Sequence, residues 1–303
     1  MNLLWMRLNE LSRVMMRRGR STAAARGILA VFVVFTLMAL AGFATFGLHP
    51  SLLARVPSAA GTYGLALRVF PIGHVWLAFA VIAAYLSMRT DGRWLSAFLL
   101  LYVLSLTSEL LGTGYGIPFG AYHYSAMLGP EWLGRVPILI PLSWFSMSVA
   151  AFGMSPGGNG RGPAAFVTRV GFTSLLLLVW DLSLDPAMSH ATTYWIWGAT
   201  GPYYGMPWSN LVGWYVTGIV LAAALWAVGA NTWMSRLSRR WLAAFYGANV
   251  LLSLGMNAAA GLWLAVGAAL AALAVTWAAM SRLARRDPDE TTNAARDSGW
   301  SAA

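Results

Sequence analysis

Residues 94–124 read WLSAFLLLYVLSLTSELLGTGYGIPFGAYHY and combine the two features that decide the fold of this chain. The stretch opens with an apolar run long enough to cross a bilayer, and this run carries one acid, Glu109, close to its end. It then continues into a segment dense in Gly, Pro and Tyr. A second apolar run ends in the same way, at Asp181 and Asp185, before a segment rich in Trp, Tyr, Gly and Pro at 194–214. Because an ionised group in hydrocarbon is costly, membrane carboxylates usually face a cavity or a partner, so these stretches predict a buried polar site between membrane helices.

The composition of the whole chain is that of a membrane protein. Hydrophobic residues make up 58% of the 303 residues and charged residues 10%, whereas soluble domains have roughly 45–50% apolar and about 25% charged residues. We predict an all-α fold, a polytopic transmembrane helical bundle with about eight spans. Each span is an apolar run of about 20 residues, and the runs are 28–47, 69–87, 94–111, 136–153, 165–183, 212–230, 241–257 and 261–280. Little more than Gly255 and Gly261 suggests a turn between the last two runs, so seven spans is the alternative count.

All 20 basic residues of the chain are Arg, and their distribution predicts its orientation. In the eight-span arrangement 17 of them fall on one side of the membrane, and only Arg55, Arg68 and Arg135 fall on the other. By the positive-inside rule, both termini lie in the cytoplasm and the two Gly/Pro segments lie toward the outer face of the cell inner (cytoplasmic) membrane. The net charge of +10 therefore reports topology and contact with anionic membrane lipids, and not nucleic-acid binding.

The chain divides by composition into three parts. Residues 1–27 form a basic cytoplasmic N-terminal segment, 28–280 the transmembrane domain, and 281–303 a polar, disordered cytoplasmic tail. The Arg-rich start, the apolar run and Ala39-Leu-Ala41 imitate a signal peptide, but the basic lead is long and the apolar run continues to Gly47. We therefore expect an uncleaved signal anchor.

The acidic residues are predicted to meet at one level of the bundle. A rise of 1.5 Å per residue places Glu109 about 22 Å, and Asp181 about 24 Å, along helices entered from the cytoplasmic side. Asp185 lies one helical turn beyond Asp181, on the same face. His74 enters its own helix from the outer side and reaches a similar level, so it is expected to converge with the carboxylates.

Several kinds of site are excluded by residue usage. The four His residues show no pair at the spacing that holds a metal ion on a helix, so we predict no metal. Cysteine is absent, which excludes disulfides, a thiol nucleophile and a thiolate metal site. The chain contains neither a Gly-x-Ser-x-Gly motif nor a P-loop or dinucleotide fingerprint. The residues therefore favour acid/base chemistry without a cofactor.

Two blocks of motifs carry a family resemblance. The first block contains Glu109-Leu-Leu-Gly112, Gly116-Ile-Pro-Phe-Gly120 and Pro141-Leu-Ser-Trp-Phe145, and the second contains Leu184-Asp185-Pro186, Trp195-Ile-Trp197 and Tyr204-Gly-Met-Pro207. Together they resemble the integral-membrane carotenoid hydratases, which are carotenoid biosynthesis proteins that include the bisanhydrobacterioruberin hydratases and the carotenoid 1,2-hydratases. The resemblance covers residues 70–260, approximately.

The resemblance implies addition of water to the terminal C1=C2 double bond of an acyclic (ψ) carotenoid end group, which gives a tertiary 1-hydroxy group. Lycopene, γ-carotene and C50 precursors carry this end group. Neither a cofactor nor a metal is implied. The implied partners are the carotenoid, membrane lipids and other enzymes of the carotenoid pathway.

The residues give this reaction a physical basis. A carboxylic acid buried away from water tends to keep its proton and can donate it to C2. Trp and Tyr faces would stabilise the resulting cation at C1, and a second carboxylate or a His would hold and deprotonate the water. We assign Asp181 as proton donor, because it follows a continuous apolar run, and Glu109 with Asp185 as the groups that orient water. The reverse assignment is the alternative. The substrate-binding residues are predicted to be His74, Tyr122, His123, Tyr124, Trp144, Tyr204, Asn210 and Trp214.

Other interpretations stay open at this point. His123 and Tyr124 also fit an aromatic belt at the membrane interface, and polar stripes on membrane helices often only hold helices together. A carotenoid end-group cyclase, or another isoprenoid-modifying enzyme, would need the same acid but no bound water. A proton-coupled transporter also combines inward carboxylates with Gly/Pro-broken helices, and a pigment-binding protein without catalysis is a further alternative.

Overall fold

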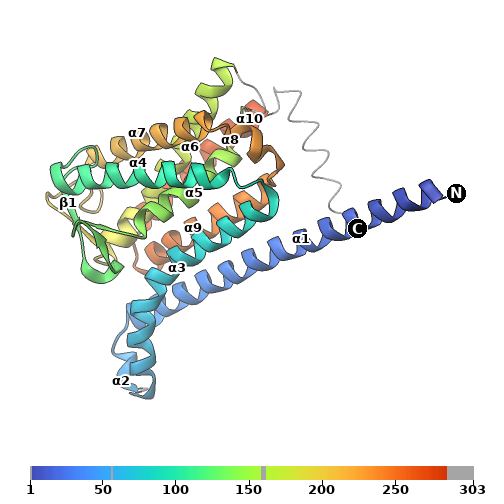
Figure 1. Cartoon of the computed structure of the whole chain (residues 1–303). Coiled ribbons are helices and arrows are strands. Elements are labelled where there is room, and N and C mark those ends of the chain that lie inside the picture. The colour runs from blue at the N-terminus through green and yellow to red at the C-terminus, as the bar shows by residue number, and fades with distance from the viewer. Residues whose placement is uncertain (1, 56, 158–161, 285–303) are drawn as a thin grey trace.

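Long helices dominate the structure, a computed structural model that describes residues 2–55, 57–157 and 162–284 (Figure 1). These helices are α1 (Asn2–Gly42), α3 (Ala60–Arg89), α4 (Trp94–Tyr115), α5 (Ile140–Met154), α6 (Pro163–Asp185), α7 (Trp208–Ala227), α9 (Arg239–Ala259) and α10 (Trp263–Ala284). The shorter helical pieces are η1 (Phe43–Gly47), α2 (Leu52–Arg55), η2 (Pro57–Ala59), η3 (Ala126–Leu128), η4 (Pro186–His190), α8 (Ala230–Trp233) and η5 (Met234–Arg236). The strands are β1 (Tyr122–Tyr124), β2 (Glu131–Trp132), β3 (Val136–Pro137) and β4 (Trp195–Trp197).

Seven of the described helices are long and apolar enough to cross a membrane. They include every long helix except α5, and the chain is therefore a multi-pass helical membrane protein, as predicted. Each of the eight predicted runs coincides with one long helix of the structure. The bundle is held by close helix contacts, such as that of α6 with α7, where a Cβ on Gly218 would lie 2.9 Å from the Cα of Ser174. Small residues that let backbones approach are the usual interface of membrane helices.

The eighth helix, α5, is short and central. Its 15 residues extend about 22 Å at 1.5 Å per residue, less than the roughly 30 Å of a bilayer core. Twelve of the 15 are buried, and α5 contacts α3, α4, α6, α7 and α9. The predicted start at residue 136 is wrong, because Val136 and Pro137 pair with β2 as a strand and the helix begins only at Ile140.

The last two predicted runs are separate helices. α9 ends at Ala259, Gly261 adopts a positive φ of 74°, and α10 starts at Trp263. The Leu262 amide donates to the Asn257 carbonyl at 2.8 Å, which satisfies one of the last carbonyls of α9. A left-handed Gly just after a helix is a frequent helix terminator. The seven helices that are long enough to span agree in number with the alternative count, but the last two runs are not merged, and α5 is the helix that is too short.

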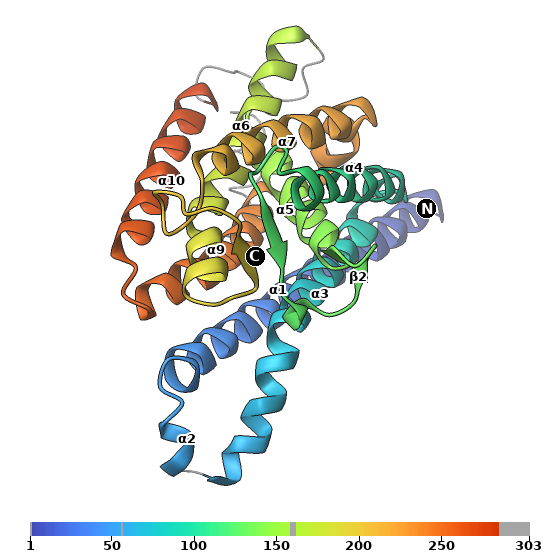
Figure 2. The same ribbon diagram turned by 90° about the vertical axis from the view of Figure 1, so that its left-hand side faces the viewer.

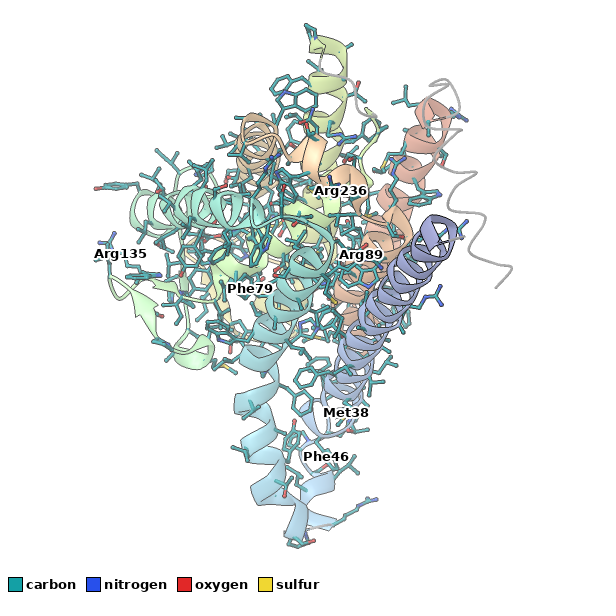
Figure 3. All side chains as sticks on the ribbon, turned by 45° about the vertical axis from the view of Figure 1, so that its right-hand side comes forward. Met38, Phe46, Phe79, Arg89, Arg135 and Arg236 are labelled. Atoms are coloured by element: carbon teal, nitrogen blue, oxygen red, sulfur yellow. The ribbon has the colours of Figure 1, made fainter. Side chains whose placement is uncertain are left out.

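The two ends of the bundle differ in character. Both strand pairs lie at one end, together with the C-terminal ends of α4 and α6 (Figures 1 and 2). Arg89, the last residue of α3, and Arg236, before α9, lie together at the other end, whereas Arg135 lies apart from them beside the β2–β3 pair (Figure 3). This segregation agrees with the arginine pattern of the sequence. Which end faces the cytoplasm stays a prediction.

The helix ends do not coincide with the boundaries between the three predicted parts. The boundary between residues 27 and 28 falls inside α1, which is continuous from Asn2 to Gly42. The start of the predicted tail, residues 281–284, still belongs to α10. Residues 285–303 lie outside the described residues.

Candidate functional site

Three buried carboxyl groups line one cavity at the strand end of the bundle. Glu109 comes from α4, and Asp181 and Asp185 come from successive turns of α6; their exposed fractions are 4%, 0% and 1%. The cavity has a volume of about 220 Å³ and is mainly apolar and aromatic. Glu109 lies on the inward stripe of α4, with Leu101, Ser105 and Gly112 at helical spacing. The structure therefore brings the three acids together in one cavity, as the helical rise predicted.

Glu109 is surrounded by hydrogen-bond donors. Its Oε2 accepts hydrogen bonds from the hydroxyls of Tyr122 and Tyr124, the latter at 2.8 Å, and its Oε1 accepts from the indole N–H of Trp144 at 2.8 Å. Burial, followed by the neighbouring Glu109 charge, raises the pKa of both Tyr122 and Tyr124 well above its usual range. The two phenols therefore stay neutral O–H donors. A carboxylate with three donors around it acts as an acceptor only.

Local sequence explains this arrangement. Gly112 lies one turn after Glu109, and a Cβ there would come within 2.8 Å of Phe119 and 2.9 Å of Tyr122. Glycine thus lets both rings lie against α4. β1 pairs with β4 so that Tyr122 is opposite Trp197 and Tyr124 is opposite Trp195. The β1–β4 pair joins the Gly/Pro segment that follows α4 to the one that follows α6. Together the two segments cover the carboxyl groups.

Asp181 and Asp185 share one amide donor. The Asn210 Nδ2 lies 2.9 Å from Asp181 Oδ2 and 2.7 Å from Asp185 Oδ2. The second oxygen of Asp185 accepts from the Trp195 indole at 2.7 Å. The second oxygen of Asp181, Oδ1, is buried and has no hydrogen-bond partner in the described structure. Among the oxygens of the three carboxyl groups, it is thus the one without a protein donor.

Three indole rings form the wall beside these acids. Trp144 and Trp214 stack with ring centroids 4.1 Å apart, and Trp180 meets Trp214 edge to face at 5.7 Å. All three rings line the cavity. Their π faces are electron-rich and attract a positive charge.

His74 lines the same cavity but is bonded elsewhere. Its Nε2 lies 3.0 Å from Thr36 Oγ1, and that hydroxyl donates to the Phe32 carbonyl at 2.9 Å. With the hydroxyl proton donated to the carbonyl, the Thr36 oxygen is available as an acceptor, an arrangement that fits a ring proton on Nε2. Within the described residues no hydrogen bond joins His74 to the carboxyl groups, so the predicted convergence is limited to a shared cavity.

Two predicted substrate-binding residues lie outside the cavity. Side chains alternate along β1, so Tyr122 and Tyr124 point inward while His123 between them is exposed. Tyr204 sits in a tight turn with a φ of 52°, where its ring packs against His190 and Tyr203. The structure therefore does not bring these two side chains to the cavity, and their contact with a substrate stays a prediction. The other six, His74, Tyr122, Tyr124, Trp144, Asn210 and Trp214, do line the cavity.

The structure adds residues that the sequence did not single out. Trp195 donates a hydrogen bond to Asp185, and its place in the Trp195-Ile-Trp197 motif was the available signal. The cavity also extends to the part of the chain formed by α1, α3 and the short helices η1, α2 and η2 between them, called the α1–α3 hairpin below. Met38, Tyr63 and Phe70 of this hairpin line the cavity. Of that hairpin, the sequence analysis linked only His74 of α3 to the carboxyl groups. No group of three or more His, Cys, Asp or Glu side chains among the described residues could hold a metal ion.

Comparison with known proteins now gives the family. The profile described as carotenoid biosynthesis protein matches residues 71–276, more than half of the chain. The chain belongs to the carotenoid biosynthesis protein family. The matched range contains all three carboxyl groups of this family member, whereas most of the α1–α3 hairpin precedes it.

A curated relative from Haloarcula japonica is similar to part of this carotenoid biosynthesis protein. It is named bisanhydrobacterioruberin hydratase and is 33% identical over 130 residues. The alignment spans 43% of this chain and 44% of the relative, less than half of each. No solved structure matches the chain significantly.

Proposed function

We propose that this protein is a carotenoid hydratase, which adds water to the terminal C1=C2 double bond of an acyclic carotenoid end group and forms a tertiary 1-hydroxy group. The observation that carries the proposal is the convergence of Glu109, Asp181 and Asp185 beside three indole rings in one apolar cavity. The cavity thus offers carboxyl groups for proton transfer and ring faces for a carbocation. The family and the name of the Haloarcula relative support the same reaction class.

Asp181 is the proposed proton donor. Its Oδ1 is buried and lacks a protein partner, whereas every oxygen of Glu109 and Asp185 accepts at least one hydrogen bond. A carboxylic acid needs one oxygen free to present its proton to the substrate. Transfer of this proton to C2 makes the C2–H bond and uses the π electron pair of the double bond. The positive charge then lies on C1, a tertiary carbon.

The indole wall stabilises that cation in this proposal. Trp214 is central, because it contacts both Trp144 and Trp180. A cation over an aromatic face gains about 2 kcal/mol or more where water is excluded. Three faces around one cavity provide this stabilisation in the transition state, where the charge develops.

Glu109 and Asp185 are the proposed acceptors for the water. A water molecule donates to a carboxylate oxygen, attacks C1 with its own lone pair and passes one proton to that oxygen. Asp185 lies beside Asp181 on the same Asn210 amide, so a proton accepted there has a short path back to the donor. The net reaction adds one water molecule to one double bond, and nothing is oxidised or reduced.

Expression of the chain in a lycopene-producing host tests the proposal. The expected product is a carotenoid heavier by one water, and growth in ¹⁸O-labelled water without O₂ is expected to place the label in the new hydroxyl. An isomer of unchanged mass would instead favour the end-group cyclase, which uses the same acid. Label arriving from O₂ would mean hydroxylation and would overturn the proposal.

A further inference from the structure

The cavity of the carboxyl groups reaches the outside of the bundle at the α1–α3 hairpin. On this side it is lined by Met38 and Gly42 of α1, by Phe43 of η1, and by Tyr63 and Phe70 of α3. The Met38 side chain is 56% exposed although it lines the cavity. The cavity is therefore open at this wall.

The opening faces hydrocarbon and not water. Met38 lies inside a candidate membrane span, Thr22–Gly47, and its exposed neighbours on the hairpin are apolar: Val34 at 55%, Leu37 at 47% and Val69 at 49%. Large exposed apolar side chains in a membrane span contact lipid tails. A molecule that enters here comes sideways from the bilayer.

The two arms of the hairpin contact each other, and both also pack against the bundle, α1 against α9 and α3 against α5. Phe35 stacks on Phe70 with centroids 4.7 Å apart, Phe46 meets Tyr63 at 5.1 Å, and Thr36 is bonded to His74. Figures 1 and 2 show the tip with α2 and the first part of α3 standing away from the rest of the bundle, and Figure 3 shows Met38 and Phe46 on this projecting part. Pro71 lies inside α3, where it removes one donor from the helical hydrogen bonding.

Other residues of the bundle complete the lining of the cavity. Met188 of η4, Tyr194 and Met256 of α9 are among them. Met side chains are flexible and adapt to irregular apolar surfaces. The lining is therefore suited to an apolar, rod-like molecule.

We propose that the α1–α3 hairpin is the lipid-side entrance of the active site, through which an acyclic polyene enters lengthwise, end group first, while its remaining chain stays in the bilayer. This inference rests on the proposed function for the identity of the ligand. The ligand class follows from the shape of the site: an opening to hydrocarbon, a cavity of about 220 Å³ that encloses only part of a long chain, and carboxyl groups at the inner end. The end group is recognised inside, so the length of the tail outside has little influence on turnover.

Gly42 allows a direct test of the entrance. It lines the cavity, has helical backbone angles, and a Cβ added there would meet nothing within 4 Å. Gly42→Phe therefore obstructs the opening without backbone strain. Gly64 of α3 is the matched control, because its added Cβ also meets nothing within 4 Å and it does not line the cavity.

The full chain and both variants are purified from a lycopene-producing host, and two quantities are measured: lycopene and its products retained per protein, and hydrated product formed. We expect Gly42→Phe to lose at least tenfold in both, and Gly64→Phe to match the wild type. If Gly42→Phe retained as much lycopene and formed as much hydrated product as the wild type, the proposed entrance would be wrong. If the wild type retained lycopene but formed no hydrated product, the proposed hydratase function would be wrong. The amounts of lycopene retained by the wild type and by the two variants would still test the entrance.

A second measurement covers the case in which Gly42→Phe fails to accumulate. The chain has no cysteine, so Gly42→Cys and Gly64→Cys each introduce a single thiol. Bound lycopene is expected to slow the reaction of Gly42→Cys with a small maleimide at least tenfold and to leave Gly64→Cys unaffected. Equal rates for Gly42→Cys with and without lycopene would overturn the proposal.

Discussion

Substitution of Asn210 by Leu removes the one amide that Asp181 and Asp185 share, and keeps the branched shape of the side chain. The amide lies 2.9 Å and 2.7 Å from the two carboxyl groups. A hydrogen bond to the charged Asp185 contributes about 1.5–3 kcal/mol and one to the protonated Asp181 about 0.5–1.5 kcal/mol, so the two bonds at mid-range amount to about 3 kcal/mol. If the amide holds both acids in their reacting positions, this energy appears in the barrier, and each ~1.4 kcal/mol is a tenfold change in rate. Hydration is expected to fall by about 10²-fold or more.

The assay is hydrated carotenoid formed per folded protein in membranes of a lycopene-producing host, with protein level and thermal unfolding measured in parallel. Asn257→Leu is the matched control. Asn257 is also buried, donates to the Ser183 carbonyl at 2.8 Å and does not line the cavity. It is expected to unfold at a lower temperature, because a buried carbonyl loses its donor, but to keep its turnover per folded molecule.

Two results would refute this reasoning. Asn210→Leu with normal accumulation and turnover within about tenfold of the wild type would mean that the shared amide does not position the acids. An equal loss of turnover in Asn257→Leu would mean that any buried amide of this bundle is needed for activity through stability alone.

The remaining predictions concern the roles of single side chains and the orientation. Asp181→Asn and Glu109→Gln keep volume but cannot transfer a proton, so each is expected to lose hydration by about 10²–10⁴-fold at normal protein level; near wild-type rates would place the acid elsewhere. Trp214→Phe is expected to lower turnover only modestly, since a ring face remains, and abolished turnover would give the indole another role. His123→Ala is expected to hydrate like the wild type, because the side chain lies outside the cavity. Reporters at the two termini are expected to read as cytoplasmic and one near Gly201 as external; an external C-terminal reporter would contradict the orientation based on arginine.

The helices and the acidic site were predictable for a simple reason. Apolar runs of about 20 residues have few folds open to them in a bilayer, and a fixed rise per residue sets the depth of an acid on each run. Glu109 and Asp181 therefore met as predicted. The Gly/Pro segments after them marked where the backbone leaves the helix.

What the sequence did not reveal depends on contacts between distant segments. The pairing of Tyr122 with Trp197 turns His123 outward, and a three-residue strand is too short for its alternation to be recognised beforehand. The same holds for Val136 and Pro137, whose pairing with β2 shortens α5. The α1 run was interpreted only as a signal anchor, and on α3 only His74 was expected near the site, since the apolar pattern of a span does not tell which of its faces borders a cavity.

The β1–β4 pair also has a consequence for how the protein is assembled. β1 follows α4 and β4 follows α6, so the first half of the chain brings Glu109 and the second half brings Asp181 and Asp185. Neither half holds a full set of acids, and the two-stranded cover closes only when both are inserted. Two polypeptides divided between α5 and α6 are therefore expected to be inert when made singly and to regain hydration when made together. Hydrated carotenoid formed in such cells would show that the two halves associate in the bilayer.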